Sequence, residues 1–169
     1  MRFGIRLAKP DDALGIARAH SESWRESYRG ILPERLLDRV DVGQRAATRS
    51  RILADPNIVG LVAYDLTHRD IVGFCDAGES RRRHVVGAAG EIYALYLVHH
   101  AKMHGLGSEM FDRCRELLAA RGLRSLVIWV LENNVHGRRF YEARGGKLGP
   151  TVHSTVGGFP VLERAYLWD

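Results

Sequence analysis

The chain has 169 residues, of which 46% are hydrophobic, enough for one buried core and, most simply, for a single domain over residues 1–169. Its net charge of +5 would suit nucleic acid, but the arginine run at 81–83 has no interleaved aromatic residue and is better explained as a solvated loop. No segment is apolar enough to span a bilayer, and the alternating start predicts a strand rather than a signal peptide. We therefore expect neither nucleic acid nor a membrane as partner.

Hydrophobic periodicity and turn residues divide the chain into helices and strands. Pro10 opens the first helix and Gly30 ends it, while glycine and proline at 157–160 separate the last two strands. In chain order we expect a strand at 2–8, helices at 10–30, 33–40 and 43–54, strands at 58–66, 70–79 and 90–98, a helix at 106–121, a strand at 126–131, a helix after Asn134 that ends at Gly145, and strands at 147–156 and 161–168.

An apolar strand runs into a glycine turn that opens the helix at 106–121, and Gly122 provides the expected left-handed cap at its end. A Cβ at Gly105 or Gly107 would keep the backbone from closing around an anion. The helix start adds free N–H groups and a positive dipole end, which suit a diphosphate. By itself this turn is weak evidence, because a Rossmann turn would need a third glycine where Met110 stands, and a Walker loop would need Gly-Lys-Ser/Thr.

The second informative block is a β-branched and aromatic strand that ends at Asn133 and Asn134, which are able to cap the next helix. That helix carries Phe140 and Tyr141. Together the two blocks resemble motifs A and B of the Gcn5-related N-acetyltransferase (GNAT) superfamily. Lys102, Gly105 and Gly107 occupy the three fixed positions of motif A, and Asn134, Gly137, Phe140 and Tyr141 match motif B.

Three positions depart from the motifs of the superfamily. Lys102 replaces the usual Gln or Arg, Gly137 replaces Ala, and residues 99–101 replace a commoner Pro-acidic-aromatic run. None of these changes removes a backbone donor. Lys102 keeps a cation near the phosphates but lacks the guanidinium fork, so the affinity for the cofactor is the property that it affects.

The resemblance implies an α/β (α+β) fold, a mixed twisted sheet flanked by helices in the order β-α-α-β-β-β-α-β-α-β-β, and acetyl coenzyme A (acetyl-CoA) as donor. In such enzymes the strand at 91–98 diverges from the strand at 126–131, and the pantetheine arm pairs with the open edge as a false strand. The diphosphate is expected on the amides of the glycine turn. The predicted cofactor-binding residues are Leu95, Tyr96, Leu97, Lys102, Met103, His104, Gly105, Leu106, Gly107, Ser108, Asn134 and Tyr141.

The resemblance also implies that Tyr141 directs its hydroxyl at the thioester sulfur. A thiol has a pKa of about 8.5 and a tyrosine of about 10, so complete proton transfer to the leaving thiolate costs roughly 2 kcal/mol. A hydrogen bond that stabilises the sulfur is therefore the safer role, with proton delivery following. A core tyrosine packed on Phe140 is the alternative interpretation.

The acceptor amine must lose a proton, because an alkylamine with a pKa of about 10 is protonated near neutral pH. Glu91 is the candidate base, since it lies eleven residues before Lys102, the offset at which histone-acetylating members carry their catalytic glutamate. It also opens a strand whose positions 91, 93, 95 and 97 are expected to share a face. A surface carboxylate paired with an arginine is the alternative, and Glu79 or a water path is the reserve.

The acceptor site is expected between the first helices and the last strand pair, with Trp24, Tyr28 and Tyr93 as candidate walls or, equally, as core residues. The segment 24–33 resembles polyamine-acetylating and related small-molecule members, but its arginines argue against a strongly cationic acceptor. We expect direct attack by a primary amine of a small molecule or protein in a ternary complex. A non-catalytic acyl-CoA-binding regulator is the alternative function.

Two cysteines and eight histidines complete the inventory of reactive residues. Cys75 and Cys114 are interpreted as small buried thiols, which fits a reducing cytoplasm. The scattered histidines give no ligand spacing, so we predict no metal. Because many members of the superfamily are dimers, the resemblance allows a homodimer.

Overall fold

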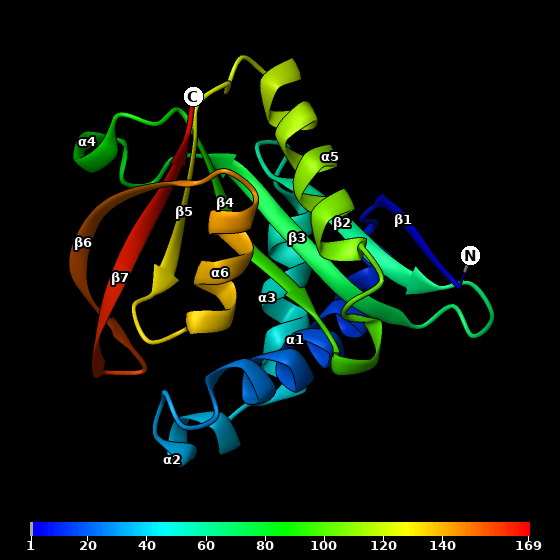
Figure 1. The fold of residues 1–169 in the computed structure, drawn as a ribbon. Coiled ribbons are helices and arrows are strands. Elements are labelled where there is room, and N and C mark those ends of the chain that lie inside the picture. Colours follow the sequence, from blue (N-terminus) through cyan, green and yellow to red (C-terminus); the bar gives the residue numbers. More distant parts are fainter. Residues whose placement is uncertain (1) are drawn as a thin grey trace.

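The computed structural model describes residues 2–169 and confirms the expected strands and long helices, with ends shifted by a few residues. Figure 1 shows their arrangement around one sheet. In chain order the elements are β1 Phe3–Leu7, the 3-10 turn η1 Pro10–Asp12, α1 Ala13–Tyr28, α2 Glu34–Asp38, α3 Val42–Ala54, β2 Val59–Asp65, β3 Ile71–Glu79, α4 Arg83–Val86, β4 Gly90–Leu97, the 3-10 turn η2 His99–Ala101, α5 Leu106–Ala120, β5 Leu126–Leu131, α6 Val135–Ala143, β6 Lys147–Val156 and β7 Phe159–Trp168.

The strands form one sheet in the order β1-β2-β3-β4-β5-β7-β6. Neighbouring strands are antiparallel except β4 and β5, which run parallel. In Figure 1, α5 and α6 lie in front of the sheet and α1 and α3 lie behind it. Contacts of α5 with β2, β3 and β4, and of α1 with β3 and β4, agree with this view. The fold is the predicted mixed sheet flanked by helices.

The two parallel strands β4 and β5 are paired only at their beginnings. Gly90 pairs with Leu126 and Glu91 with Val127, and the register ends there. Beyond this point the strands diverge as the two arms of a V, which is visible in Figure 1. The backbone groups of β4 that face β5 after Glu91 therefore have no partner in the neighbouring strand.

A bulge in β4 changes which side chains share a face. Asp76 of β3 pairs with Ala94 and Ala77 pairs with Ile92, so Tyr93 is an extra residue. As a result Ile92 faces the same cluster as Leu95 and Leu97, beneath α5, while Ala94 and Tyr96 face α1. The expectation that positions 91, 93, 95 and 97 share one face is wrong, because the inserted residue reverses the alternation.

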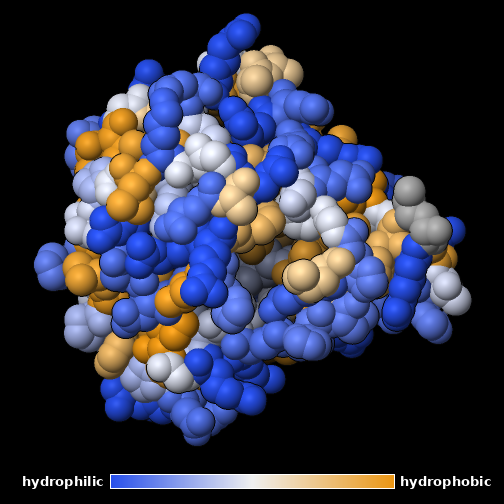
Figure 2. All heavy atoms as spheres, in the orientation of Figure 1, coloured by the Kyte–Doolittle hydropathy of each residue, from blue (hydrophilic) through white to orange (hydrophobic). Residues whose placement is uncertain are grey.

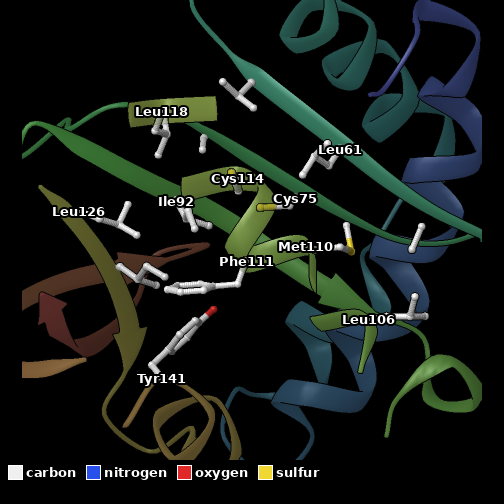
Figure 3. Packing of buried hydrophobic residues seen from close by; sticks show 14 of the residues in the cluster. Leu61, Cys75, Ile92, Leu106, Met110, Phe111, Cys114, Leu118, Leu126 and Tyr141 are labelled. Atoms are coloured by element: carbon white, nitrogen blue, oxygen red, sulfur yellow. The ribbon is translucent and has the colours of Figure 1, made fainter. Parts of the chain in front are cut away.

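The largest core cluster lies between the sheet and α5 (Figure 3). Met110, Phe111 and Cys114 of α5 are completely buried, and Cys114 packs beside the equally buried Cys75 of β3. Burial of each large side chain contributes about 1.5–3 kcal/mol, so α5 is held firmly against the sheet. The two cysteines are free and buried, as predicted. The neighbouring Cys114 thiol and burial together raise the pKa of Cys75.

The arginine run at 81–83 lies in the connection between β3 and β4, as predicted, and Arg81 and Arg83 are exposed, but two of its side chains are paired with other elements. Arg81 pairs with Glu91, and Arg82 pairs with Glu163 at 2.6 Å while its guanidinium lies 4.9 Å from the Trp129 ring centre. The helical turn α4 that follows is too short for hydrophobic periodicity to reveal. The aromatic partners of the run come from strands distant in sequence, which a local reading cannot supply.

Two boundaries also differ from the expected ones. The strand expected to continue to residue 98 ends at Leu97 and is followed by η2, which contains His99 and His100. The last hairpin turns at Gly157 and Gly158, both with positive φ, so β7 begins earlier than expected. Among residues 2–169 no helix is long and apolar enough to cross a membrane.

Candidate active site

The open end of the V between β4 and β5 lies at the centre of one face of the molecule. Figure 2 shows this face hollowed between α6 and the start of α5, with hydrophobic side chains in the walls of the hollow. The unpaired edge of β4, from Ile92 onward, borders it. A buried backbone amide without a partner is costly, so a ligand with amide groups of its own is suited to this edge.

The glycine turn lies between β4 and α5 and presents free donors. Met103 and Gly105 both have left-handed backbones, with φ of 61° and 79°. The N–H groups of residues 103–108 donate no hydrogen bond to other residues of the described range. Gly107 lies inside the first turn of α5, where a Cβ would meet Phe140 at 3.4 Å. Six free N–H groups and the positive end of the α5 dipole are features that suit an anion.

Lys102 lies next to this turn but is held by an acidic side chain that sequence analysis missed. Its Nζ lies 2.9 Å from Glu26 of α1, and the same carboxylate binds His99 Nδ1 at 2.7 Å. Burial acts to raise the pKa of Glu26, but the hydrogen bonds from Lys102 and His99 outweigh it and lower that pKa. A diphosphate on the turn would compete with Glu26 for Lys102.

Tyr141 of α6 is buried, with its ring between Phe111 and Trp168. In Figure 3 its hydroxyl is directed away from α6 into the space between β4 and β5. Other tyrosine hydroxyls, such as those of Tyr28 and Tyr166, are hydrogen-bonded, whereas no residue in the described range bonds to that of Tyr141. Burial, with smaller effects of Cys75 and Tyr28, raises the pKa of Tyr141 far above its ordinary value. The group is therefore a neutral hydrogen-bond donor.

A polar network fixes the helix that carries Tyr141. Asn134 caps α6, as predicted, by accepting a hydrogen bond from the Gly137 N–H at 3.0 Å. Arg138 Nε donates to the Tyr166 hydroxyl at 3.0 Å, and this hydroxyl donates to Glu142 at 2.6 Å. These bonds tie α6 to β7, and they could not be deduced from the sequence because the partners lie on separate elements.

Glu91 is almost completely buried, with 1% of its surface exposed. Its carboxylate accepts hydrogen bonds from the Arg81 backbone N–H at 2.9 Å, from Arg81 Nε at 3.1 Å and from Arg81 Nη2 at 2.5 Å. It lies where β4 and β5 are still paired. The arginine partner agrees with the alternative interpretation, although the carboxylate is buried and not on the surface. The role of Glu91 as base stays a prediction, and direct proton transfer to it requires Arg81 to move away.

The structure brings two of the three predicted acceptor-wall residues together. Trp24 and Tyr28 meet edge to face, with ring centres 5.5 Å apart, and the Tyr28 hydroxyl lies 2.7 Å from that of Tyr96. Tyr93 lies elsewhere, because its hydroxyl donates to the Glu79 carbonyl at 2.5 Å. Tyr93 is therefore beside Gly78 and Glu79 at the end of β3, whereas Tyr96 pairs with Phe74 farther along the same strand.

Family comparison agrees with this arrangement of β4, the glycine turn and α6. A model of the acetyltransferase (GNAT) family matches residues 16–146. The chain belongs to the GNAT family. The uncharacterized GNAT relative YuaI of Bacillus subtilis, named as an N-acetyltransferase, is 30% identical over 165 residues, which cover 97% of this chain and 91% of YuaI. A probable N-acetyltransferase of Mycobacterium tuberculosis is 25% identical over 155 residues, covering 83% of this chain and 77% of the relative.

Solved structures share the GNAT fold over almost the whole chain. The PaiA N-acetyltransferase of Thermoplasma acidophilum, in complex with coenzyme A, superposes with a TM-score of 0.71 at 20% identity, covering 98% of this chain and 100% of PaiA. YncA of Salmonella typhimurium, with acetyl-CoA, has a TM-score of 0.69 at 16% identity, covering 99% of this chain and 94% of YncA. Within residues 2–169 no group of three or more His, Cys, Asp and Glu side chains is arranged to hold a metal ion.

Proposed function

We propose that this GNAT protein transfers acetyl from acetyl-CoA to a primary amine of a small molecule or protein, by direct attack in a ternary complex. The observation that carries the proposal is the open edge of β4, which leads from the Tyr141 hydroxyl to the free amides of the glycine turn. A thioester on a long amide-containing arm with a diphosphate has this sequence of groups. Family membership supports the same donor.

The residues present fit the parts of acetyl-CoA. Backbone groups of Leu95, Tyr96 and Leu97 lie on the unpaired edge and would bind the two pantetheine amides. The amides of residues 103–108 would bind the diphosphate, with Lys102 as a nearby cation. Asn134 is placed by its cap at the start of α6 and would border the arm on its other side.

The reaction needs one donor at the sulfur and one route for the amine proton. The amine nitrogen attacks the thioester carbonyl carbon, the C–S bond breaks, and coenzyme A leaves as a thiolate. Tyr141 would donate a hydrogen bond to this sulfur. Because burial raises the pKa of Tyr141, its proton is held more tightly than that of a free phenol, and stabilisation of the thiolate is favoured over complete transfer.

The proton of the attacking amine must leave before or during the attack. Glu91 is the proposed base, with the condition that Arg81 swings into solvent. The Arg81 side chain is 64% exposed and can reach solvent, and its departure leaves the buried carboxylate with the Arg81 backbone N–H as partner. Glu79, at the end of β3, and a path through water remain the alternatives.

Calorimetry and an acetylation assay test the proposal together. Titration of purified protein with coenzyme A should give saturable heat, and acetyl-CoA with a panel of primary amines should release thiol and yield an N-acetyl product. Heat without thiol release from any amine, and without slow hydrolysis of acetyl-CoA, would instead identify an acyl-CoA-binding regulator. Absence of heat at millimolar coenzyme A would contradict both functions.

Two predictions about the setting of the reaction accompany this proposal. The adjacent free thiols of Cys75 and Cys114 suit a reducing cytoplasm. A homodimer is expected because many members of the superfamily are dimers. Light scattering on the purified protein measures the oligomeric state directly.

A further inference from the structure

Three arginines gather between α1 and α3, behind the part of β4 that borders the hollow. Arg45 and Arg49 lie one turn apart on α3, and Arg25 lies in the last turn of α1. Arg49 forms a buried ion pair with Asp76 of β3. Within residues 2–169 neither Arg25 nor Arg45 forms an ion pair, although Glu22 and Glu26 line the same surface hollow as Arg25.

Arg45 is the arginine of this group that has a buried donor without a partner in the described range. Its guanidinium lies 5.2 Å from the Trp24 ring centre, and the buried donor is Nη1. Burial lowers the pKa of Arg45, and Arg49 and Arg25 lower it further, against an opposing effect of Tyr96. By contrast, the hydrogen bonds that Arg6 donates to the Asp12 carboxylate raise the pKa of Arg6. A buried guanidinium without an anion is expensive, and a carboxylate is the group that would satisfy it.

The position of Arg45 connects it with the proposed reaction centre through Tyr96. Trp24, which Arg45 contacts, meets Tyr28 with ring centres 5.5 Å apart. The Tyr28 hydroxyl is hydrogen-bonded to that of Tyr96 at 2.7 Å. The contacts from Arg45 through Trp24 and Tyr28 therefore lead from α3 to β4, the strand whose open edge borders the hollow. The Arg45 side chain is partly exposed, so a ligand can reach it.

A neighbouring histidine lies in the same positively charged surroundings. His20 of α1 packs on Tyr96, with ring centres 5.1 Å apart, and its Nδ1 lies 3.3 Å from Arg49. Burial, followed by the charges of Arg45 and Arg49, lowers the pKa of His20 to about 3. A second cation here would be opposed by the same charges, so this surface favours an anionic group on the acceptor.

We propose that Arg45 binds the carboxylate of the acceptor, and that the acceptor is therefore a small primary amine with an acid group, an amino acid or a close analogue. This inference rests on the proposed acetyl transfer. The carboxylate pairs with the Arg45 guanidinium beside Trp24 and takes no part in bond making. The amine at the other end of the molecule attacks the thioester, loses its proton, and leaves with the acetyl group.

Matched pairs of acceptors test the assignment. Thiol release is measured with L-amino acids and with the corresponding carboxamides, at saturating acetyl-CoA. The amine of a carboxamide is less basic and more of it is unprotonated, so unassisted reactivity favours the amide. We expect the wild-type protein to prefer at least one acid over its amide in spite of this bias.

Variants of α3 then locate the recognition. Arg45→Gln should raise KM for the preferred acid by about tenfold to a hundredfold, the loss typical of one charge-assisted contact. It should leave KM for acetyl-CoA and for the amide unchanged, and Arg45→Lys should restore part of the preference. Arg51→Gln, an exposed arginine of the same helix, is the matched control and should behave as wild type.

The outcomes separate this inference from the acetyl transfer on which it rests. Equal losses for acid and amide in Arg45→Gln would show that Arg45 only supports Trp24 and would overturn the inference. Acetylation of simple amines or aminoalkyl phosphonates in preference to every amino acid would also overturn the inference. That result would leave the proposed acetyl transfer intact. If coenzyme A itself gives no heat with the wild-type protein, the acetyl transfer fails instead, and this inference fails with it.

Discussion

Tyr141 is buried, with 8% of its surface exposed, and no described residue is hydrogen-bonded to its hydroxyl. The hydroxyl would gain its partner only when a thioester sulfur lies between β4 and β5, so its benefit would appear in the reaction and not in folding. Its chemical surroundings, Phe111 and Trp168, are apolar and keep the phenol neutral. A donor held this way needs little reorganisation during thiolate departure.

Tyr141→Phe should therefore reduce kcat about a hundredfold, the usual effect of removing one stabilising donor, with an unchanged dissociation constant for coenzyme A. The melting temperature should stay the same or rise, because the lost hydroxyl has no partner in the folded chain. Turnover kinetics, calorimetry and thermal unfolding measure the three quantities. A wild-type kcat would reject the donor role.

Glu91 and Arg81 form an ion pair, and substitutions of the two residues are expected to affect turnover differently. If Glu91 is the base, Glu91→Gln should lose turnover by at least about tenfold, within the range of general-base effects, and recover at high pH as the free amine becomes abundant. Arg81→Ala frees the carboxylate and should keep turnover. The pH profiles of both variants and the wild type decide. Equal loss of thermal stability in the two variants, with unchanged pH profiles, would make the pair structural.

At the level of elements, the turn between β4 and α5 contains two glycines with different physical reasons. Gly105 has a positive φ and open space around its missing side chain, whereas Gly107 lies in helical backbone. Gly105 is required by the left-handed backbone of the turn. Gly107 is expected to be required because a phosphate approaches the α5 amides closely.

Gly105→Ala should lower the free energy of unfolding by about 1–2 kcal/mol, the cost of a left-handed alanine. Gly107→Ala should leave stability equal or up to about 1 kcal/mol higher, as alanine favours helix, while the affinity for coenzyme A falls. Denaturant unfolding and calorimetry on both variants give the comparison. Full affinity in Gly107→Ala would show that the diphosphate does not contact this amide.

For the whole molecule, the half-buried His20 predicts how stability depends on pH. Its pKa in the folded chain is about 3 and about 6.5 in an unfolded chain. Between these values the unfolded state binds more protons, so stability rises with pH, by at most about 1.4 kcal/mol per unit. Asp76 acts in the opposite sense, because burial raises its pKa despite Arg49. Asp76 is present both in the wild-type protein and in the His20 variant described next, so its contribution is common to both.

His20→Phe should therefore flatten the stability profile between pH 3 and 6.5, the window given by the two pKa values of the histidine. Phenylalanine keeps an aromatic ring against Phe74 and Tyr96. Chemical unfolding at intervals of pH measures both proteins. Parallel profiles would mean that His20 is not the group that titrates.

Local patterns were sufficient for much of this protein. The strands, the long helices, the glycine turn and the Asn134 cap follow from alternation, helical periodicity and capping chemistry, which act over a few residues. The glycine turn and the Phe140-Tyr141 pair likewise sufficed to indicate the family. Residues such as Lys102 and Gly107 carry this information because their neighbours in sequence are also their neighbours in space.

Only the tertiary structure decided how distant groups meet. The bulge at Tyr93 depends on pairing with β3, the Glu26 contact with Lys102 depends on where α1 passes, and the convergence of Arg45 with Trp24 depends on how α3 packs against α1. Local composition could not anticipate these contacts, because the free energy of a charge is set by the partners and the burial that the folded chain gives it. The sequence thus determined the elements and the family, and packing determined which charges are satisfied and which are left for a ligand.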